Sequence, residues 1–168
     1  MIKAIVYLSN TGYTEEYAGI LGDKTGLPVF DLDSALVELP QGTDVVFLGW
    51  VAGGRVNGYK DASEHFCVRA LCAVGLSSGE EQLAKVRKMN EASSSMRFFV
   101  LPGGFDMDRL HGSDKLLMMF IRATVGRFIS WKRNKSADDI EMLDLLYNGG
   151  SRVSADKLSG VLDFLEQM

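Results

Sequence analysis

Five short apolar runs, spread along the first 101 residues, constrain the fold of this chain more than any other feature. They are Ile2–Leu8, Val29–Leu32, Val45–Leu48, Ala70–Leu76 and Phe98–Leu101. Several are continuous rather than alternating and are rich in Val, Ile, Phe and Leu, which is typical of strands buried on both faces. The runs therefore predict a parallel sheet covered by helices.

Helical patterns separate most of these runs. The expected helices are one with Tyr17, Ile20 and Leu21 inward, ending at Gly22 or Gly26, then Tyr59–Arg69, Glu80–Glu91, Ser113–Trp131, one capped by Ser136, and one capped by Ser154. The helical content of residues 33–44 stays open. Strands that alternate with helices indicate an open, doubly wound α/β sheet, and we expect residues 1–168 to form a single domain.

Composition and charge exclude several classes of protein. The chain is 46% hydrophobic and 24% charged, as expected of a globular domain, and its net charge of −4 disfavours wholesale nucleic-acid binding. Two cysteines without a CxxC motif and two well-separated histidines predict no metal site. The start of the chain lacks a signal-peptide pattern, and the apolar stretch Leu116–Ile121 is too short to span a bilayer, so we expect a cytoplasmic protein.

A hydroxyl-rich loop, Ser9–Thr14, connects the first expected strand to the first expected helix. Ligands of open α/β sheets bind beyond the carboxyl ends of the strands, and a helix N-terminus stabilises an anion without Lys or Arg. A Walker A loop requires a lysine and a Rossmann loop requires three glycines, and both are missing here. The remaining alternatives are a site for one terminal phosphate and an ordinary helix cap.

The loop resembles the phosphate loop of flavodoxins, T/S-x-T-G-x-T, placed after the first strand as in that family. The resemblance implies bound FMN and a five-stranded parallel sheet of order 2-1-3-4-5 with helices on both faces, to which this chain adds extra helices at its C-terminal end. It implies that the FMN phosphate contacts Ser9, Asn10, Thr11, Gly12, Tyr13 and Thr14. Tyr13 stands where many flavodoxins have asparagine, which changes the local contacts.

The resemblance also implies that the flavin ring lies between the loops after the third and fourth parallel strands. The first of these loops supplies Trp50, Val51, Ala52, Gly53 and Gly54, of which Trp50 can stack on the ring and the two glycines can reorient next to its N5 atom. The second supplies Ser77, Ser78 and Gly79. No aromatic residue occurs in it, so either the outer face of the ring is open or Phe105 covers it. Trp50 as a plain core or rim residue is the alternative.

The C-terminal third is longer than in typical flavodoxins. Its longest expected helix combines a broad apolar surface with cations near its end, among them Arg127, Lys132 and Arg133. One interpretation is a core-facing helix whose cations complement its dipole. The other is an amphipathic, basic surface that contacts an anionic membrane or substrate. This extension is similar to the menaquinone-dependent, flavodoxin-like protoporphyrinogen oxidases.

Three functions remain open from the sequence. The first is electron transfer through bound FMN, with a redox protein, a small molecule or a quinone as partner and no protein acid, base or nucleophile required. The second is an oxidoreductase of the protoporphyrinogen-oxidase type or another quinone-linked enzyme. The third is a flavodoxin-fold module that has lost FMN binding.

Overall fold

A five-stranded parallel sheet forms the centre of the molecule. The computed structural model describes residues 1–76, 80–90, 96–106 and 112–168. The parallel strands are β1 (Ala4–Leu8), β2 (Val29–Asp31), β3 (Asp44–Ala52), β5 (Cys67–Gly75) and β6 (Arg97–Pro102). Their spatial order is β2-β1-β3-β5-β6, which confirms the predicted order 2-1-3-4-5 and the flavodoxin-like, doubly wound class.

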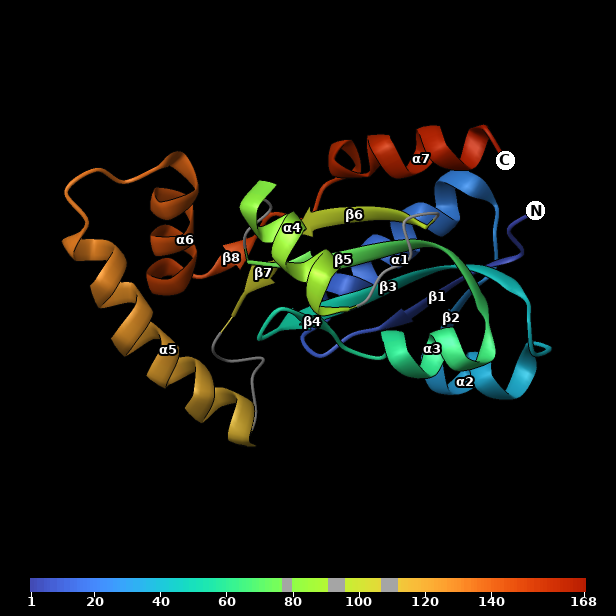
Figure 1. Cartoon of the computed structure of the whole chain (residues 1–168), viewed down its shortest axis with the longest axis horizontal. Coiled ribbons are helices and arrows are strands. Elements are labelled where there is room, and N and C mark those ends of the chain that lie inside the picture. Colours follow the sequence, from blue (N-terminus) through green and yellow to red (C-terminus); the bar gives the residue numbers. More distant parts are fainter. Residues whose placement is uncertain (77–79, 91–95, 107–111) are drawn as a thin grey trace.

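Helices cover both faces of this sheet (Figure 1). The helices α1 (Tyr13–Thr25) and α7 (Ser159–Glu166), the latter preceded by the 3-10 turn η1 (Ala155–Leu158), pack on one face. The helices α2 (Leu32–Glu38), α3 (Tyr59–His65) and α4 (Glu80–Met89) pack on the other. The predicted helix Tyr59–Arg69 was wrong at its end, because residues 67–69 already belong to β5. The helix α2 fills the region that the sequence left open.

The alternation of buried residues along the strands divides the core into two layers. In β3, Val46 and Leu48 pack toward α1, whereas Val45 and Phe47 pack toward α2 and α3. All four side chains are fully buried. Burial on both faces explains why this strand reads as a continuous apolar run rather than an alternating one.

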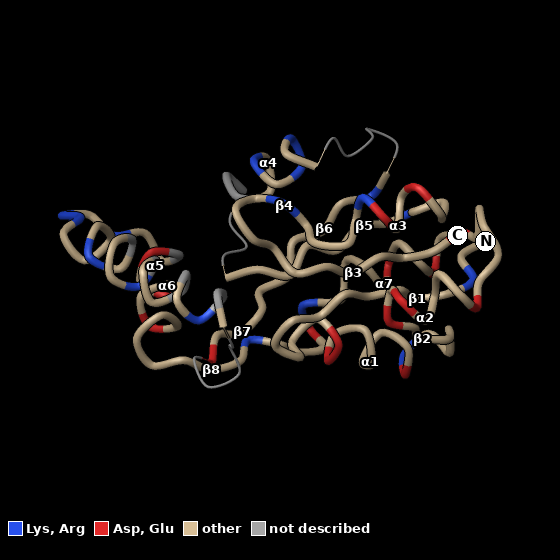
Figure 2. Tube along the Cα trace, turned by 90° about the horizontal axis from the view of Figure 1, so that it is seen from below, with Lys and Arg blue, Asp and Glu red and all other residues tan. Residues whose placement is uncertain are grey.

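A helical hairpin is inserted between β6 and α7. It begins with β7 (Gly104–Phe105), continues through α5 (Gly112–Trp131) and α6 (Ala137–Asn148), and returns through β8 (Gly150–Ser151), which pairs antiparallel with β7. Figures 1 and 2 show α5 and α6 beyond the edge at which the parallel strands end. The insertion therefore lies on the side of the sheet where ligands of this fold class bind.

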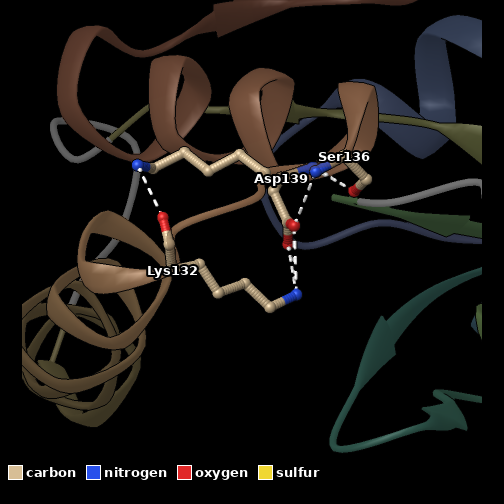
Figure 3. Close-up of polar contacts among 4 residues, drawn as sticks. Lys132, Ser136 and Asp139 are labelled. Atoms are coloured by element: carbon tan, nitrogen blue, oxygen red, sulfur yellow. Dashed lines mark hydrogen bonds and ion pairs between the residues drawn. The ribbon is translucent and has the colours of Figure 1, made fainter.

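The corner between α5 and α6 is held by polar contacts (Figure 3). The Ser136 hydroxyl accepts a hydrogen bond from the Asp139 amide, and the Asp139 carboxylate accepts one from the Ser136 amide, so the predicted cap is a full capping box. Lys132, the first residue after α5, donates to the same carboxylate at 3.0 Å. These contacts lower the pKa of Asp139, the hydrogen bond to the Ser136 amide contributing most.

Tyr17 fastens the base of the insertion to the first helix. Its side chain is fully buried, and its hydroxyl donates to the Pro102 carbonyl at 2.7 Å, with the Arg152 carbonyl 3.4 Å away. Pro102 ends β6, and Arg152 follows β8, so one hydroxyl joins α1 to both ends of the inserted segment. Burial raises the pKa of Tyr17 to about 12.

We expect Tyr17→Phe to lower the free energy of unfolding at pH 7 by about 1–3 kcal/mol, because the buried Pro102 carbonyl loses its donor. The folded protein favours neutral Tyr17, so the stabilising effect of this group is complete below pH 10 and is lost as the pH rises toward 12. Urea unfolding across this range should therefore show a shallower alkaline decline for the variant than for the wild type. Tyr147→Phe on α6 is the control. Parallel alkaline declines in wild type and Tyr17→Phe would contradict the assignment.

Candidate functional site

The loop after β1 wraps around the start of α1. Gly12 is the N-cap of α1 and has a φ of 91°, in the left-handed region that favours glycine. The amide of Gly12 donates to the Ser9 hydroxyl oxygen at 3.1 Å, and the Gly12 carbonyl accepts the first helical hydrogen bond, from Glu16, at 2.9 Å. These two hydrogen bonds fix the loop at the junction between β1 and α1.

The turn offers several hydrogen-bond donors. As an N-cap, Gly12 provides no side-chain acceptor for the first-turn amides of α1, so the helix end depends on another acceptor. Because the Ser9 oxygen accepts from the Gly12 amide, the hydroxyl proton of Ser9 can point toward an external acceptor. Thr14, in the first turn of α1, is a polar residue that is only 2% exposed. This donor set suits a phosphate, whose oxygens are acceptors.

The charges around the loop are negative rather than positive. Glu15 and Glu16 occupy the first turn of α1, and no Lys or Arg occurs in Ser9–Thr14. The pKa of Tyr7 is raised by burial, then by the nearby charge of Glu15 and a hydrogen bond to it. An anion bound here would therefore depend on amides, hydroxyls and the helix dipole rather than on a cation.

Asp31 lies at the end of the neighbouring strand β2, but it is used for helix capping. Its carboxylate accepts from the Ser34 amide at 3.0 Å and from the Ser34 hydroxyl at 2.7 Å. These bonds lower the pKa of Asp31, with the Ser34 amide as the largest cause. Asp31 thus starts α2 as a capping carboxylate.

Tyr13 connects the loop to the inserted segment. Its side chain is 6% exposed, and a Cβ atom added to Gly104 would lie 2.4 Å from two atoms of the Tyr13 ring. The same added atom would lie 2.7 Å from the Gly150 carbonyl oxygen. Only a glycine at position 104 allows the ring of Tyr13, the first residue of α1, to lie against the β7–β8 ribbon.

Residues Trp50–Gly54 form a tight hairpin instead of an open loop. Trp50, expected just past the strand, lies within β3 and pairs with Val74 of β5, and its side chain is half-buried. Val51 and Ala52 pair antiparallel with β4 (Arg55–Val56). Gly53 and Gly54 make the two-residue turn, with φ values of 58° and 88° that match the hairpin turn favoured by Gly-Gly.

Asn90, at the end of α4, holds this hairpin in place. Its side-chain oxygen accepts from the Val56 amide at 2.8 Å, and its side-chain nitrogen donates to the Gly54 carbonyl at 3.0 Å and to the Val86 carbonyl at 2.6 Å. The turn therefore has a carbonyl fixed by a side chain from another element. The sequence carries no signal for this contact, because 34 residues separate Asn90 from Val56.

We expect Asn90→Ala to destabilise the protein by about 1–3 kcal/mol, because the buried Val56 amide and the Gly54 carbonyl both lose their partner. Hydrogen exchange at Val56 should accelerate more than exchange in β1. Asn134→Ala, at an exposed position after α5, is the matched control. Unchanged exchange at Val56 in Asn90→Ala would show that the hairpin does not depend on this side chain.

The remaining residues that were predicted to lie against the flavin ring are Ser77, Ser78, Gly79 and Phe105. Ser77, Ser78 and Gly79 lie outside the described residues. Phe105 is 5% exposed and packs with Leu145 of α6 and Leu76, so it does not form an exposed cover for a ring. Thus the loop after β1 and the β3–β4 hairpin are the predicted site segments that the structure describes.

Two pockets lie away from these segments. One of about 530 Å³ lies along β6, between α4 and α7, and includes Arg87, Arg97 and Phe164. The other, of about 320 Å³, lies on the ribbon and α6, where Arg122 is 5.0 Å from the centre of the Tyr147 ring. Across residues 1–76, 80–90, 96–106 and 112–168, no three His, Cys, Asp or Glu side chains are grouped as a metal ion would require.

Comparison with known proteins adds a likeness in structure. The chain is similar to a flavodoxin from the domain Archaea, at 14% sequence identity and a TM-score of 0.38, over 88% of this chain and 98% of that chain. No protein-family model matches the sequence, and no curated protein matches it either. In the described part of the chain, no helix combines the length and the apolar character needed to cross a membrane.

Proposed function

We propose that this protein binds FMN at the carboxyl edge of its sheet and transfers electrons through it. The observation that supports this most is the turn at the start of α1, which is rich in hydrogen-bond donors and lies at the point where the strand order reverses between β1 and β3. In this fold class, that crevice is where ligands bind. A terminal phosphate matches the hydrogen-bonding character of the turn.

The phosphate end is held by the loop and the first turn of α1. The first-turn amides of a helix have no intrahelical acceptor, so those of α1 can donate to a phosphate, and each bond to a charged oxygen contributes about 1.5–3 kcal/mol. Ser9 and Thr11 add hydroxyl groups, and Asn10 lies exposed beside them. The left-handed Gly12 keeps its position free of a Cβ atom that would occupy the same space.

The ring end is bounded by the β3–β4 hairpin. We assign Trp50 as the stacking wall, with Val51 and Ala52 behind it, and the Gly53–Gly54 turn as the contact to the ring edge. Because Asn90 fixes the Gly54 carbonyl, reorientation at this turn is confined to the peptide between the two glycines. Ser77, Ser78 and Gly79 complete the proposed site on its pyrimidine side.

Bound FMN supplies one- and two-electron transfer that no side chain can perform. The protein positions the cofactor, excludes water from one of its faces and surrounds it with a weakly negative field, given Glu15, Glu16 and Asp31. A nearby negative charge disfavours the addition of electrons, and thus lowers the reduction potential. Neither an acid, a base nor a nucleophile from the protein is required.

A quinone-linked oxidoreductase, of the protoporphyrinogen-oxidase type, is the second candidate. The observation in its favour is the α5–α6 insertion, which lies beyond the same edge of the sheet as the proposed flavin site. The two candidates differ in what the reduced protein does. An enzyme of this type reoxidises with a soluble quinone analogue and oxidises a porphyrinogen repeatedly, whereas an electron carrier requires a redox protein as partner.

The direct test is reconstitution with FMN. The purified protein should give a yellow complex whose visible spectrum differs from that of free FMN, and titration should quench the flavin fluorescence at one FMN per chain. Thr11→Leu should weaken binding by about tenfold, because a hydroxyl donor is replaced by a branched alkyl group. Thr43→Leu, at an exposed turn before β3, is the control. A protein that stays colourless in excess FMN would show that the module has lost the cofactor.

A further inference from the structure

The outer face of α5 is apolar and exposed. The exposed fractions of its large side chains are 69% for Leu116, 53% for Met119, 66% for Phe120, 70% for Phe128 and 85% for Trp131. The face from Leu116 to Trp131 is about 22 Å long at 1.5 Å per residue. Large apolar side chains exposed together on one helix face indicate an interaction site.

The opposite face of α5 is already used for packing. Ile129 is 5% exposed, and a Cβ atom added to Gly126 would lie 2.9 Å from the Tyr147 hydroxyl on α6. Arg122 lies over the ring of the same Tyr147. Residues 122, 126 and 129 share one side of the helix, so α6 supports α5 from behind and leaves the outer face open.

Basic residues lie along α5 and in the turn that follows it. Residues 115–136 contain six Lys and Arg and no Asp or Glu, whereas the whole chain has a net charge of −4, so the remaining residues carry −10. Figure 2 shows the Lys and Arg of this segment, in blue, gathered at the α5 end of the molecule. Arg127 and Arg133 are exposed, and Lys132 is paired with Asp139. The α5–α6 hairpin as a whole, residues 112–148, also contains five Asp and Glu, so its net charge is +1. The positive charge therefore belongs to α5 and the turn after it, and the acidic residues of the hairpin lie mostly on α6.

We propose that the outer face of α5 is a docking surface for an anionic lipid bilayer, on which the helix lies parallel to the membrane. Apolar side chains enter the boundary between headgroups and acyl chains, Trp131 lies at headgroup level, and Arg127 extends from the apolar face to lipid phosphates. The rest of the chain outside residues 112–148 carries a net charge of −5 and is repelled by the same surface, so charge contributes to the orientation as well as to the affinity. This orientation directs the insertion, and the sheet edge behind it, toward the membrane.

A second copy of the chain fits this face less well. Arg127 lies on the same side of the helix as Leu116, Phe120 and Trp131, so pairing two such faces would bury an arginine from each copy. Residues 115–131 of α5 contain no Asp or Glu, so two such faces packed against each other would not offer Arg127 a carboxylate. Burial of an unpaired charge is costly, whereas lipid phosphates neutralise it.

Co-sedimentation with vesicles tests the proposal. The full-length protein should bind vesicles of phosphatidylglycerol and phosphatidylcholine at low ionic strength, and should bind pure phosphatidylcholine vesicles at least about tenfold more weakly. Arg127→Glu with Arg133→Glu should reduce binding to the anionic vesicles by about tenfold or more. Lys24→Glu with Lys157→Glu, two exposed positions on α1 and η1, changes the net charge equally and should leave binding unchanged.

A second pair of variants tests the apolar contribution. Phe128→Ser with Trp131→Ser should also reduce vesicle binding by about tenfold or more, without unfolding the protein, because both side chains are exposed. Sedimentation velocity without lipid measures self-association in parallel. The proposal is overturned if the wild type does not bind anionic vesicles, if both pairs of variants bind as the wild type does, or if the wild type is a dimer that the Phe128→Ser and Trp131→Ser changes dissociate. Because vesicle binding is read without flavin, failure here leaves the FMN proposal untouched.

Discussion

Replacing Gly12 with valine should weaken FMN binding at least about 100-fold, the largest effect on the cofactor that we expect from one substitution. Gly12 has a φ of 91°, which a β-branched residue strongly disfavours. Relief of that strain would rotate the first-turn amides of α1 away from the phosphate, and the new side chain would lie where the anion binds. Fluorescence titration with FMN measures the change.

Gly26→Val separates loss of the site from simple strain. Gly26 ends the same helix with a φ of 70°, and an added Cβ atom would meet nothing within 4 Å. Both variants should lose stability by about 1–3 kcal/mol, but only Gly12→Val should lose FMN affinity. If Gly26→Val weakened FMN binding as much as Gly12→Val, the loop would have no specific role.

Gly104→Ala should have the second largest effect, and on two properties at once. Its Cβ atom would lie 2.4 Å from the Tyr13 ring and 2.7 Å from the Gly150 carbonyl oxygen, so the ring or the ribbon must move. We expect the free energy of unfolding to fall by about 1–3 kcal/mol. Because Tyr13 is the first residue of α1, its displacement should also weaken FMN binding, by about tenfold.

Gly160→Ala on α7 is the matched control for this experiment. A Cβ atom at position 160 would meet the Phe99 ring at 3.5 Å, an ordinary contact distance, and alanine favours the helix. Urea unfolding and FMN titration of both variants give the comparison. Wild-type stability and affinity in Gly104→Ala would mean that the insertion is not coupled to the loop after β1.

The parallel sheet was predictable because its signal is local. Each strand of the parallel sheet overlaps a short apolar run of the sequence. The Ser136 cap and the start of α1 could be predicted as well, because each depends on residues a few positions apart. The helix α2 was not predicted, because it has only seven residues and begins at Leu32, inside an apparent strand. The pair Gly53–Gly54 favours a two-residue hairpin turn, but the resemblance to flavodoxins predicted an open loop at this position instead.

Contacts between distant residues could not be predicted. In the β7–β8 ribbon, Gly104 pairs with Ser151. Tyr17 hydrogen-bonds to Pro102, 85 positions away in the sequence, and Asn90 hydrogen-bonds to Gly54, 36 positions away. Phe105 illustrates the consequence: its position after β6 suggested a cover for the ring, but pairing with β8 turns its side chain into a core with Leu145. Short polar or glycine-rich segments gain their role from the partner that the fold brings to them.

The most direct test of the phosphate site is the ratio of the dissociation constants for riboflavin and FMN, measured on the same protein preparation. The two ligands share the ring and differ by the phosphate, so the ratio isolates what the turn at Ser9–Thr14 contributes. We predict that FMN binds at least about 100-fold more tightly than riboflavin, the equivalent of two charged hydrogen bonds. Equal affinities would contradict the account, because the phosphate would then make no net contribution to binding.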